Sequence, residues 1–150
     1  MFSLAADKNI PLVLMHMQGT PQTMQHDPSY DDVVGEISSF LVQQARQAEQ
    51  AGVSKRNIMI DPGIGFGKTR NHNMELMANL KSFVDIGYPV LLGASRKRFL
   101  GSISKETEAS NLVGATCATT VLGVQAGVRI FRVHDVLPNR QAADVAFHTG

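Results

Sequence analysis

The sequence contains a single cysteine, no tryptophan and almost no net charge. Cys117 alone cannot form an internal disulfide or a multi-cysteine zinc site, and one thiol is typical of proteins from a reducing cytoplasm. The formal net charge of +1 at pH 7 argues against a nucleic-acid or acidic-membrane partner, because both select strongly basic surfaces. Any positive charge that matters for function must therefore be local.

Long apolar runs are also missing. No stretch approaches the ~18 apolar residues of a membrane span, and Asp7 and Lys8 interrupt the N-terminal segment before the core of a signal peptide could form. The chain does have 150 residues, 43% of them hydrophobic, which is enough for one core and too little for two. We therefore expect one cytoplasmic domain over residues 1–150.

Apolar runs and amphipathic segments alternate along the chain. Four strands are expected, each a continuous apolar run typical of parallel strands covered on both faces, at residues 11–15, 57–60, 89–93 and 128–133. Helices with the matching period are expected at residues 31–51, at 73–86, from after Glu108 to about 126, and in a short segment after Pro138. Asn73 is the expected N-cap of the second helix. A polar loop is expected at residues 95–108.

Four strand–helix units in succession predict a parallel α/β fold. Two closures fit this pattern: an open doubly wound sheet, and part of a (β/α)₈ barrel, which typically needs ~250 residues. The length favours the open sheet. The polar residues favour the barrel, because they follow every strand, as the site residues of a barrel do. They are Met15-His16, Asp61, Gly93 to Lys97, and Arg132 to Asp135.

The second strand runs into a glycine-rich loop, residues 61–67, with the sequence Asp-Pro-Gly-Ile-Gly-Phe-Gly. So many glycines would weaken any regular element. Gly67-Lys68-Thr69 is not the end of a phosphate loop, because that motif needs a glycine where Pro62 stands. The dinucleotide-binding fingerprint fails as well, because Lys68 occupies the place of its third glycine. Neither a nucleotide hydrolase nor a dehydrogenase is favoured.

Asp61 stands directly after the second strand, where it can accept two parallel hydrogen bonds from a guanidine-like edge of a ligand. It can equally cap the glycine-rich loop, and the sequence leaves both interpretations open. Phe66 has no helix or strand core to join and can cover a planar ligand. Met15 fits a ligand wall or the core equally well. His16 has no other ligating residue at metal-binding spacing, which favours a hydrogen-bonded structural histidine.

Cationic residues follow the third and fourth strands. Ser95-Arg96-Lys97 places a hydroxyl and two cations there, suited to a carboxylate, a carbonyl oxygen or a phosphate, unless the segment is a solvated basic turn. Arg132 and His134 alternate along an extended segment and therefore point to the same side. They suit a phosphate ligand, unless Asp135 pairs with one of them in a purely structural cluster.

Taken together, these segments resemble the C-terminal half of dihydropteroate synthases, enzymes of the folate pathway. The combination of DPGIGFGK, SRK and RVHDV is specific, because related pterin-binding methyltransferases are not expected to carry SRK with RVHDV. The matching segments cover nearly the whole chain in the family's order: Leu14 to Gly19 with Pro21, Asp61 to Lys68, Gly93 to Lys97, and Arg132 to Val136.

The resemblance implies a (β/α)₈ fold, of which this chain supplies four βα units. It also implies a transferase that joins 4-aminobenzoate to 6-hydroxymethyl-7,8-dihydropterin pyrophosphate and releases pyrophosphate. Sulfonamides would compete with aminobenzoate. The implied pterin contacts are Met15, Asp61, Phe66, Gly93, Lys97 and Arg132. The implied aminobenzoate contacts are Phe66, Ser95 and Lys97, and the implied pyrophosphate contacts are Arg132 and His134. The implied catalytic residues are Lys97, Arg132 and His134, which assist the departure of pyrophosphate before the amine attacks.

Complete members of the family begin with a strand carrying an NVTPDSF-like motif. Their first half also supplies an Asn near the pyrophosphate and Mg²⁺, and an Asp and an Asn on the pterin. This chain lacks these segments, and Phe2 to Asn9 resembles the tail of the fourth barrel helix. We therefore expect Mg²⁺ to be held through the substrate pyrophosphate and an Asn absent from this chain, which itself supplies no metal ligand.

A half barrel leaves two strand edges unpaired, so we expect a homo-oligomer or pairing with an N-terminal half. We expect no useful synthase activity from the chain alone. A second interpretation is a non-catalytic half-barrel module that acts only by assembly with another chain. A third, a nucleotide hydrolase, rests on Gly67-Lys68-Thr69 alone.

Overall fold

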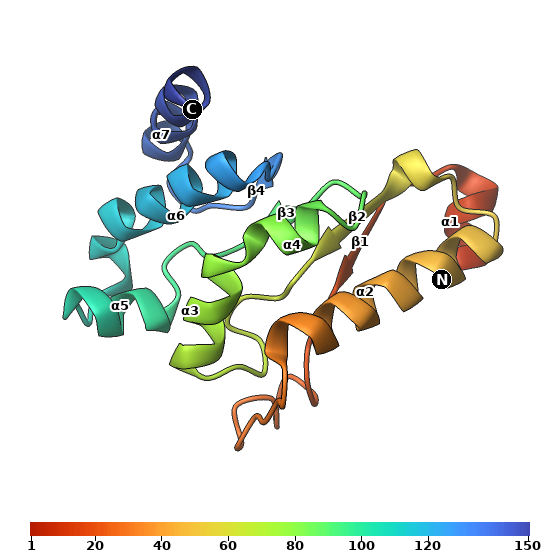
Figure 1. The fold of residues 1–150 in the computed structure, drawn as a ribbon, viewed down its shortest axis with the longest axis horizontal. Coiled ribbons are helices and arrows are strands. Elements are labelled where there is room, and N and C mark those ends of the chain that lie inside the picture. The colour runs from red at the N-terminus through yellow and green to blue at the C-terminus, as the bar shows by residue number, and fades with distance from the viewer.

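The structure is a computed structural model that describes all of residues 1–150. Short strands alternate with longer helices from end to end (Figure 1). The strands are β1 (Leu12–Met15), β2 (Ile58–Asp61), β3 (Leu91–Leu92) and β4 (Ile130–Phe131). The helices are α1 (Phe2–Lys8), α2 (Val33–Gln50), α3 (Arg70–Ala78), α4 (Leu80–Val84), α5 (Arg98–Ser104), α6 (Val113–Ala126) and α7 (Val136–Thr149), with 3₁₀ turns at Lys55–Asn57 and Ala109–Asn111. No helix has the length and apolar content that a bilayer crossing needs.

All strand pairings are parallel, which confirms the predicted α/β class. β1 pairs with β2 so that Met15 lies opposite Asp61, and β3 pairs with β4. A single parallel bridge between Ile60 and Val90 joins the two pairs. The strands therefore lie side by side in chain order, and their carboxyl ends share one edge of the sheet. This edge is where the sequence analysis expects the polar residues to gather.

β3 and β4 are shorter than the apolar runs that predicted them. Pro89 lacks the N–H that a paired strand residue donates. The N–H of Val128 is used at the end of α6, where it donates to the carbonyl of Gly123 at 2.9 Å. Pro89 therefore joins the sheet only through its carbonyl, which accepts from the N–H of Ile60 at 3.0 Å, and Val128 is bonded to α6 instead of the sheet.

The helices cover one face of the strands. Ile58 and Ile60 of β2 are fully buried against Ile37 and Leu41 of α2 and their neighbours in one hydrophobic core. The residues that alternate with them, such as Val13 and Met59, lie on the opposite face and are exposed or half-buried. The expectation of strands covered on both faces is therefore wrong for this chain, although the second face is apolar enough to be covered.

Two helix starts differ from expectation. Thr69, not Asn73, caps α3: its hydroxyl accepts from the N–H of His72, whose ring accepts from the N–H of Thr69. Asn73 lies within the helix, and its side chain bridges to the glycine-rich loop. α7 starts at Val136 and has 14 residues, so it is not a short helix after Pro138. Proline is tolerated there because the first turn of a helix does not use its N–H groups.

α5 was not expected, because it lies within the polar segment 95–108. It buries Phe99 and Leu100, an apolar stripe too short to stand out as a helical period. α2 and α6 lie where the sequence predicts them, and Asp32 caps α2 by accepting from the N–H of Gly35.

Candidate functional site

The site begins where β1 and β2 end side by side. The parallel register places Met15 opposite Asp61, and the N–H of His16 donates to the carbonyl of Asp61 at 3.0 Å. Met15 is half-buried and Asp61 is only 3% exposed. Two residues expected at the ligand therefore lie side by side.

Asp61 is held from within the chain. Its Oδ1 accepts from the N–H of Gly63 at 2.7 Å, which is the loop-capping role. Its Oδ2 accepts no hydrogen bond from the protein. Burial raises the pKa of Asp61, while the Gly63 N–H and the positive charges of Arg132, Lys68 and Lys97 act in the opposite direction. One carboxyl group can thus cap the loop and still accept hydrogen bonds from a ligand, so the two interpretations are compatible.

The glycine-rich loop packs directly on the backbone that follows β1. Gly63 has a φ of +71°, and a Cβ there would lie 1.8 Å from the carbonyl oxygen of His16. Gly67 has a φ of +62°, and a Cβ there would lie 2.5 Å from the carbonyl oxygen of Gln18. Side chains cannot be accommodated at either position without moving the backbone. The glycines are therefore needed for close packing of the two loops.

Side chains from three other segments hold the polar groups of this loop. Asn73 of α3 accepts from the N–H of Gly65 at 2.8 Å, and Gln25 donates to the carbonyl of Gly65 at 2.8 Å. The hydroxyl of Tyr30 donates to the carbonyl of Gly67 at 2.8 Å. The loop is consequently fixed before any ligand arrives.

Lys68 is a site residue that the sequence analysis missed. It is 3% exposed, and its Nζ donates to the carbonyl of Phe66 at 2.7 Å and lies 3.1 Å from Nδ1 of His16. Burial lowers the pKa of Lys68 to about 7, with Asp61 raising it and Lys97 lowering it. A phosphate-loop lysine keeps its ammonium for the ligand, whereas the Lys68 ammonium is engaged by the Phe66 carbonyl and His16. The single hint in the sequence is a lysine that directly follows a glycine-rich segment.

His16 is buried beside this ammonium, which confirms a hydrogen-bonded structural histidine. Burial and the neighbouring positive charge of Lys68 lower the pKa of His16 from 6.5 to about 4, against a smaller opposite effect of Glu36. The imidazole packs edge-on against Phe40, with ring centroids 5.0 Å apart. It is therefore neutral at physiological pH and can accept a hydrogen bond from Lys68.

Phe66 and Lys97 form the side of the site that faces α5. The Lys97 ammonium lies 4.0 Å from the centroid of the half-buried Phe66 ring, a cation–π contact. Burial and Arg132 lower the pKa of Lys97, and Asp61 raises it. A cavity of about 380 Å³ opens beside Lys97. Its lining residues are Gln25, Gly65, Lys68, Arg70, Asn73, Lys97, Arg98, Phe99 and Ser102.

Arg132 and His134 lie on the same side of the segment after β4, as predicted. Both are exposed, while Val133 between them is half-buried. The Arg132 side chain packs directly on Gly93, because a Cβ added to Gly93 would lie 2.7 Å from Nη2 of Arg132. These residues adjoin a second cavity of about 450 Å³, whose lining also includes Ser95 and Lys97.

The loops after β3 and β4 are joined by two contacts. The buried hydroxyl of Ser95 accepts from the N–H of His134 at 3.1 Å and lies 2.8 Å from its ring Nδ1. Arg96 donates through Nε and Nη2 to both carboxylate oxygens of Asp135, at 3.1 and 2.9 Å. Arg96 lines the second cavity, but its guanidinium is already paired with Asp135, and Asp135 pairs with neither Arg132 nor His134. Lys97 and Arg132 are the two cations near the cavity without a carboxylate partner.

No group of three or more His, Cys, Asp or Glu side chains gathers anywhere in the structure in a way that could hold a metal ion. The charged groups at the second cavity are cations, which suit an anionic ligand.

Comparison with known proteins gives consistent results. The family model described as "Pterin binding enzyme" matches residues 1–134. The dihydropteroate synthase of Escherichia coli (strain K12) is 40% identical over 141 residues, which cover 94% of this chain and 50% of that protein. The chain therefore spans about half the length of the curated relative.

Solved structures agree with this match. The dihydropteroate synthase of Stenotrophomonas maltophilia superposes with a TM-score of 0.94 at 47% identity, covering 99% of this chain and 56% of that one. The enzyme from Thermus thermophilus in complex with 6HMPPP gives a TM-score of 0.92 at 42% identity, covering 97% and 57%. By the extent of the family match, the chain belongs to the pterin-binding enzymes.

Proposed function

We propose that this chain is the C-terminal half of a dihydropteroate synthase, a (β/α)₈ enzyme in which it supplies four βα units. The reaction joins 4-aminobenzoate to 6-hydroxymethyl-7,8-dihydropterin pyrophosphate and yields dihydropteroate and pyrophosphate. The observation that carries the proposal is the buried Asp61, whose Oδ2 has no partner in the protein, at the base of a glycine-rich loop fixed in advance. The Thermus thermophilus enzyme has been solved with 6HMPPP and with 4-aminobenzoate.

The pterin would lie against Asp61 and Met15. The amino-pyrimidine edge of a pterin presents two adjacent N–H donors, and a carboxylate accepts such a pair in parallel. Oδ2 of Asp61 is available for one of these bonds, and Oδ1 keeps an accepting position besides the one used by Gly63. Met15 would form the apolar wall beside the ring.

The aromatic amine would lie near Phe66 and Lys97. The Phe66 ring can stack with the benzene ring, and the Lys97 ammonium is placed to attract the carboxylate. Ser95 has fewer hydrogen bonds left for a ligand than the sequence predicts, because its hydroxyl already contacts the backbone N–H and the ring of His134. A sulfonamide drug has been seen in the Yersinia pestis enzyme, and we propose the same class of competitor here.

The anion site would be formed by Lys97, Arg132 and His134. In the reaction the C–O bond between the pterin methylene and pyrophosphate breaks, and pyrophosphate leaves with the electron pair. The amine nitrogen then forms the new C–N bond and loses a proton to solvent. Arg132 and Lys97 would stabilise the charge that develops on the leaving group, which is the main catalytic task of this half of the site. An amine that attacks unprotonated needs no general base.

The side chains of this chain do not fit a Mg²⁺ site, because hard cations select oxygen ligands and the charged groups at the second cavity are cations. Mg²⁺ would come with the pyrophosphate and an Asn from outside this chain.

The free edges of the sheet suggest a partner. β1 and β4 each pair on one side only. The groove beside β1 has a volume of about 400 Å³ and is mostly apolar, with Val13 44% exposed. Its lining residues are Met1, Phe2, Val13, Leu14, Met15, Phe40 and Gln44. We propose that an N-terminal half, or a second copy of this chain, covers these edges.

The test is dihydropteroate formation by the purified chain alone and together with the separately produced N-terminal half of the Stenotrophomonas maltophilia enzyme. We expect no turnover from the chain alone, and turnover from the mixture that is lost in Asp61→Asn. A folded complex that binds pterin without turnover would support the non-catalytic module instead. Turnover by the chain alone would overturn the expectation that it is incomplete.

A further inference from the structure

The proposed reaction does not use Lys68, although an ammonium buried this deeply is costly to keep. Its Nζ donates to the carbonyl of Phe66 at 2.7 Å and lies 3.1 Å from Nδ1 of His16. While Lys68 is charged its Nζ can only donate, so in that state His16 accepts through Nδ1 and carries its hydrogen on Nε2. No carboxylate is within hydrogen-bond distance of Nζ. Removing a charge from water without a close counter-ion costs free energy, and the contacts with the Phe66 carbonyl and His16 offset part of that cost.

The charged groups around Lys68 come from several elements. Asp61, at the end of β2, attracts its charge, and Lys97, at the start of α5, repels it. Glu36 of α2 acts on His16, and Arg132 after β4 acts on Asp61. Lys97 and Arg132 line the second cavity, whereas Lys68 is 3% exposed and contributes only to the lining of the first cavity, beside Lys97. A Cβ on Gly63 would lie 3.3 Å from Nζ, so the ammonium also packs against the turn that Asp61 caps.

We propose that Lys68 is a positioning residue of the site: its ammonium joins the Phe66 carbonyl to His16 and balances the charge of Asp61 from below, so that carboxylate and aromatic ring are set before ligand binds. The contacts of Lys68 link the end of β1 to the loop after β2, which are the two segments that frame the proposed pterin pocket. Lys68 acts on the ligands through Asp61 and Phe66, because the hydrogen-bond partners of its ammonium are the Phe66 carbonyl and His16.

A consequence for the ligand follows, and it rests on the proposed function. A pterin edge that donates two hydrogen bonds needs Asp61 as a carboxylate. Without the Lys68 charge, Asp61 takes up its proton at a higher pH. The acid limb of pterin affinity should then move to higher pH in Lys68→Met. A lysine that only filled space would lower affinity equally at every pH.

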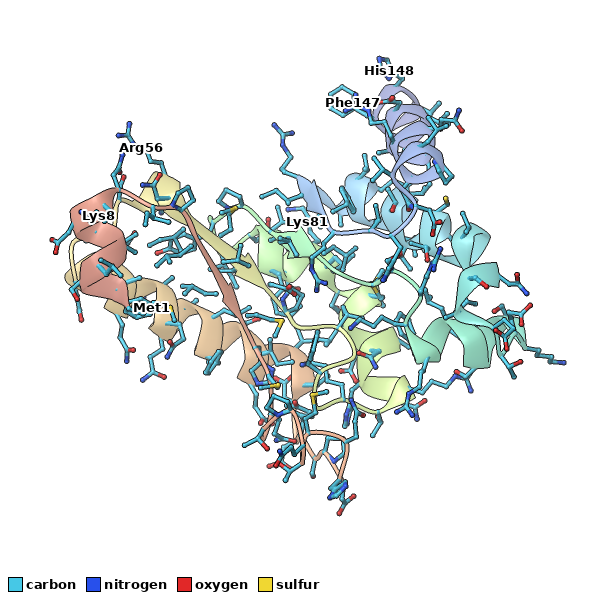
Figure 2. The ribbon with its side chains drawn as sticks, turned by 180° about the vertical axis from the view of Figure 1, so that it is seen from behind. Met1, Lys8, Arg56, Lys81, Phe147 and His148 are labelled. Atoms are coloured by element: carbon cyan, nitrogen blue, oxygen red, sulfur yellow. The ribbon has the colours of Figure 1, made fainter.

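The first test needs no ligand. The titration of the Asp61 carboxyl carbon is followed by NMR in the unmodified chain, in Lys68→Met and in Lys81→Met. Lys81, labelled in Figure 2, is the control because it is exposed on α4 and its ammonium pairs with Asp85 rather than with a group of the site. We expect the pKa of Asp61 to rise by about one unit in Lys68→Met, as for loss of an opposite charge nearby, and to be unchanged in Lys81→Met. Coincident titrations in folded Lys68→Met would overturn the proposal.

If Lys68→Met does not fold, the side-chain carbon next to Nζ is titrated in the unmodified chain. Burial lowers the pKa of Lys68 to about 7, and a titration near that value supports the buried ammonium. A titration at the ordinary value of exposed lysines would place Nζ in water and overturn the proposal.

The second test measures the affinity for 6-hydroxymethyl-7,8-dihydropterin pyrophosphate from pH 5 to 8, with Lys68→Arg added to restore the charge. We expect the acid limb to move up by about one pH unit in Lys68→Met and to return towards the original position in Lys68→Arg. A uniform loss of affinity with no movement of the limb would contradict positioning through charge. If the unmodified chain binds no pterin at any pH, the proposed function fails, and the ligand-free titration still decides the role of Lys68.

Discussion

At the β1–β2 end of the sheet, the chain itself supplies partners for the polar groups of the glycine-rich loop, and both Asp61 and Lys68 are 3% exposed. At the β3–β4 end, Arg132 and His134 extend into an open cavity, and the Arg132 side chain has no hydrogen-bond partner in the protein. The pairing of the strands differs in the same sense, because β1 and β2 share four register positions and β3 and β4 share two.

The difference follows from the chemistry of the two proposed ligand parts. A neutral ring edge is recognised by hydrogen-bond geometry, so the acceptor must be fixed before binding. A pyrophosphate brings its own strong charge and can order flexible cations as it binds. The β1–β2 end is thus rigid because it must recognise the shape of a ring edge. The cations of the β3–β4 end are exposed because they must attract a charged group. The predictions below test this contrast, starting from the largest expected effect.

Gly63→Ala should cost the most stability. The new methyl group would lie 1.8 Å from the carbonyl oxygen of His16, at a backbone conformation that L-residues rarely adopt. We expect a loss of about 3 kcal/mol or more in the free energy of unfolding, measured in urea. Gly87→Ala is the control, because Gly87 also has a positive φ but nothing within 4 Å of the new methyl, and it should lose only about 1–2 kcal/mol. Equal losses of unfolding free energy in the two variants would show that the glycine-rich loop moves easily. That result would contradict a rigid β1–β2 end.

Acid should destabilise the protein through His16. Its pKa falls from 6.5 to about 4 on folding. Between these two pH values His16 is therefore protonated in the unfolded chain and neutral in the folded chain. The stability from this group is complete above pH 6.5 and is lost as the pH falls through 4, by about 3 kcal/mol in total. Urea unfolding at pH 7 and pH 4 measures the loss, and His16→Asn should reduce it, whereas the exposed His26→Asn should not. An undiminished loss in His16→Asn would place the ring in water.

Arg96→Met tests the contact that joins the loops after β3 and β4. The two-bond pair with Asp135 is half-buried, so we expect a loss of about 1–2 kcal/mol in stability. The exposed pair Arg140–Asp144 within α7 is the matched control, and Arg140→Met should leave the free energy of unfolding nearly unchanged because solvent screens the pair. If both variants lose the same stability, the Arg96–Asp135 pair does not fix the loops after β3 and β4 to each other.

Arg132→Ala should have the smallest effect on stability, within about 0.5 kcal/mol, because the side chain is exposed and makes no hydrogen bond. The affinity of this variant for inorganic pyrophosphate, measured by calorimetry, should nevertheless fall about 10-fold or more, as expected on losing one hydrogen bond to a charged group, which contributes about 1.5 kcal/mol or more. A large loss of stability with unchanged pyrophosphate affinity would assign Arg132 to the structure rather than to the ligand.

Much of the site could be predicted from local sequence. Asp61 follows an apolar run, and a residue in that place must lie at the carboxyl end of a strand. Arg132 and His134 alternate in an extended segment, and a period of two fixes their common side. These inferences succeed because they depend only on neighbouring residues.

Other features depend on partners that are distant in the sequence. The burial of Lys68 requires His16, 52 positions away, and the role of Arg96 depends on Asp135, 39 positions away. Composition gives no signal for either contact. The sequence overestimates the lengths of β3 and β4 for a similar reason. In β4, for example, the N–H of Val128 donates to the carbonyl of Gly123 in α6 and not to the sheet.

The packing of the whole helix α7 is also not predictable from local sequence. It packs against α6 at one end of the molecule, and Figure 2 shows Phe147 and His148 at its outer end. Phe147 is 67% exposed. A sequence can indicate that such a face is apolar, but the exposure of Phe147 follows from how α7 packs on α6, which local sequence does not determine.

The β1–β2 end is, in our proposal, a pterin pocket formed in advance around Asp61. Calorimetric titration of the purified chain and of Asp61→Asn with 6-hydroxymethyl-7,8-dihydropterin pyrophosphate in Mg²⁺ buffer tests this most directly, with the molecular mass determined on the same samples. We expect binding to the unmodified chain that is about 30- to 100-fold weaker in Asp61→Asn, as expected for losing about 2–3 kcal/mol of charged hydrogen bonding. Equal affinities, or no binding by a folded chain, would contradict a preformed pocket.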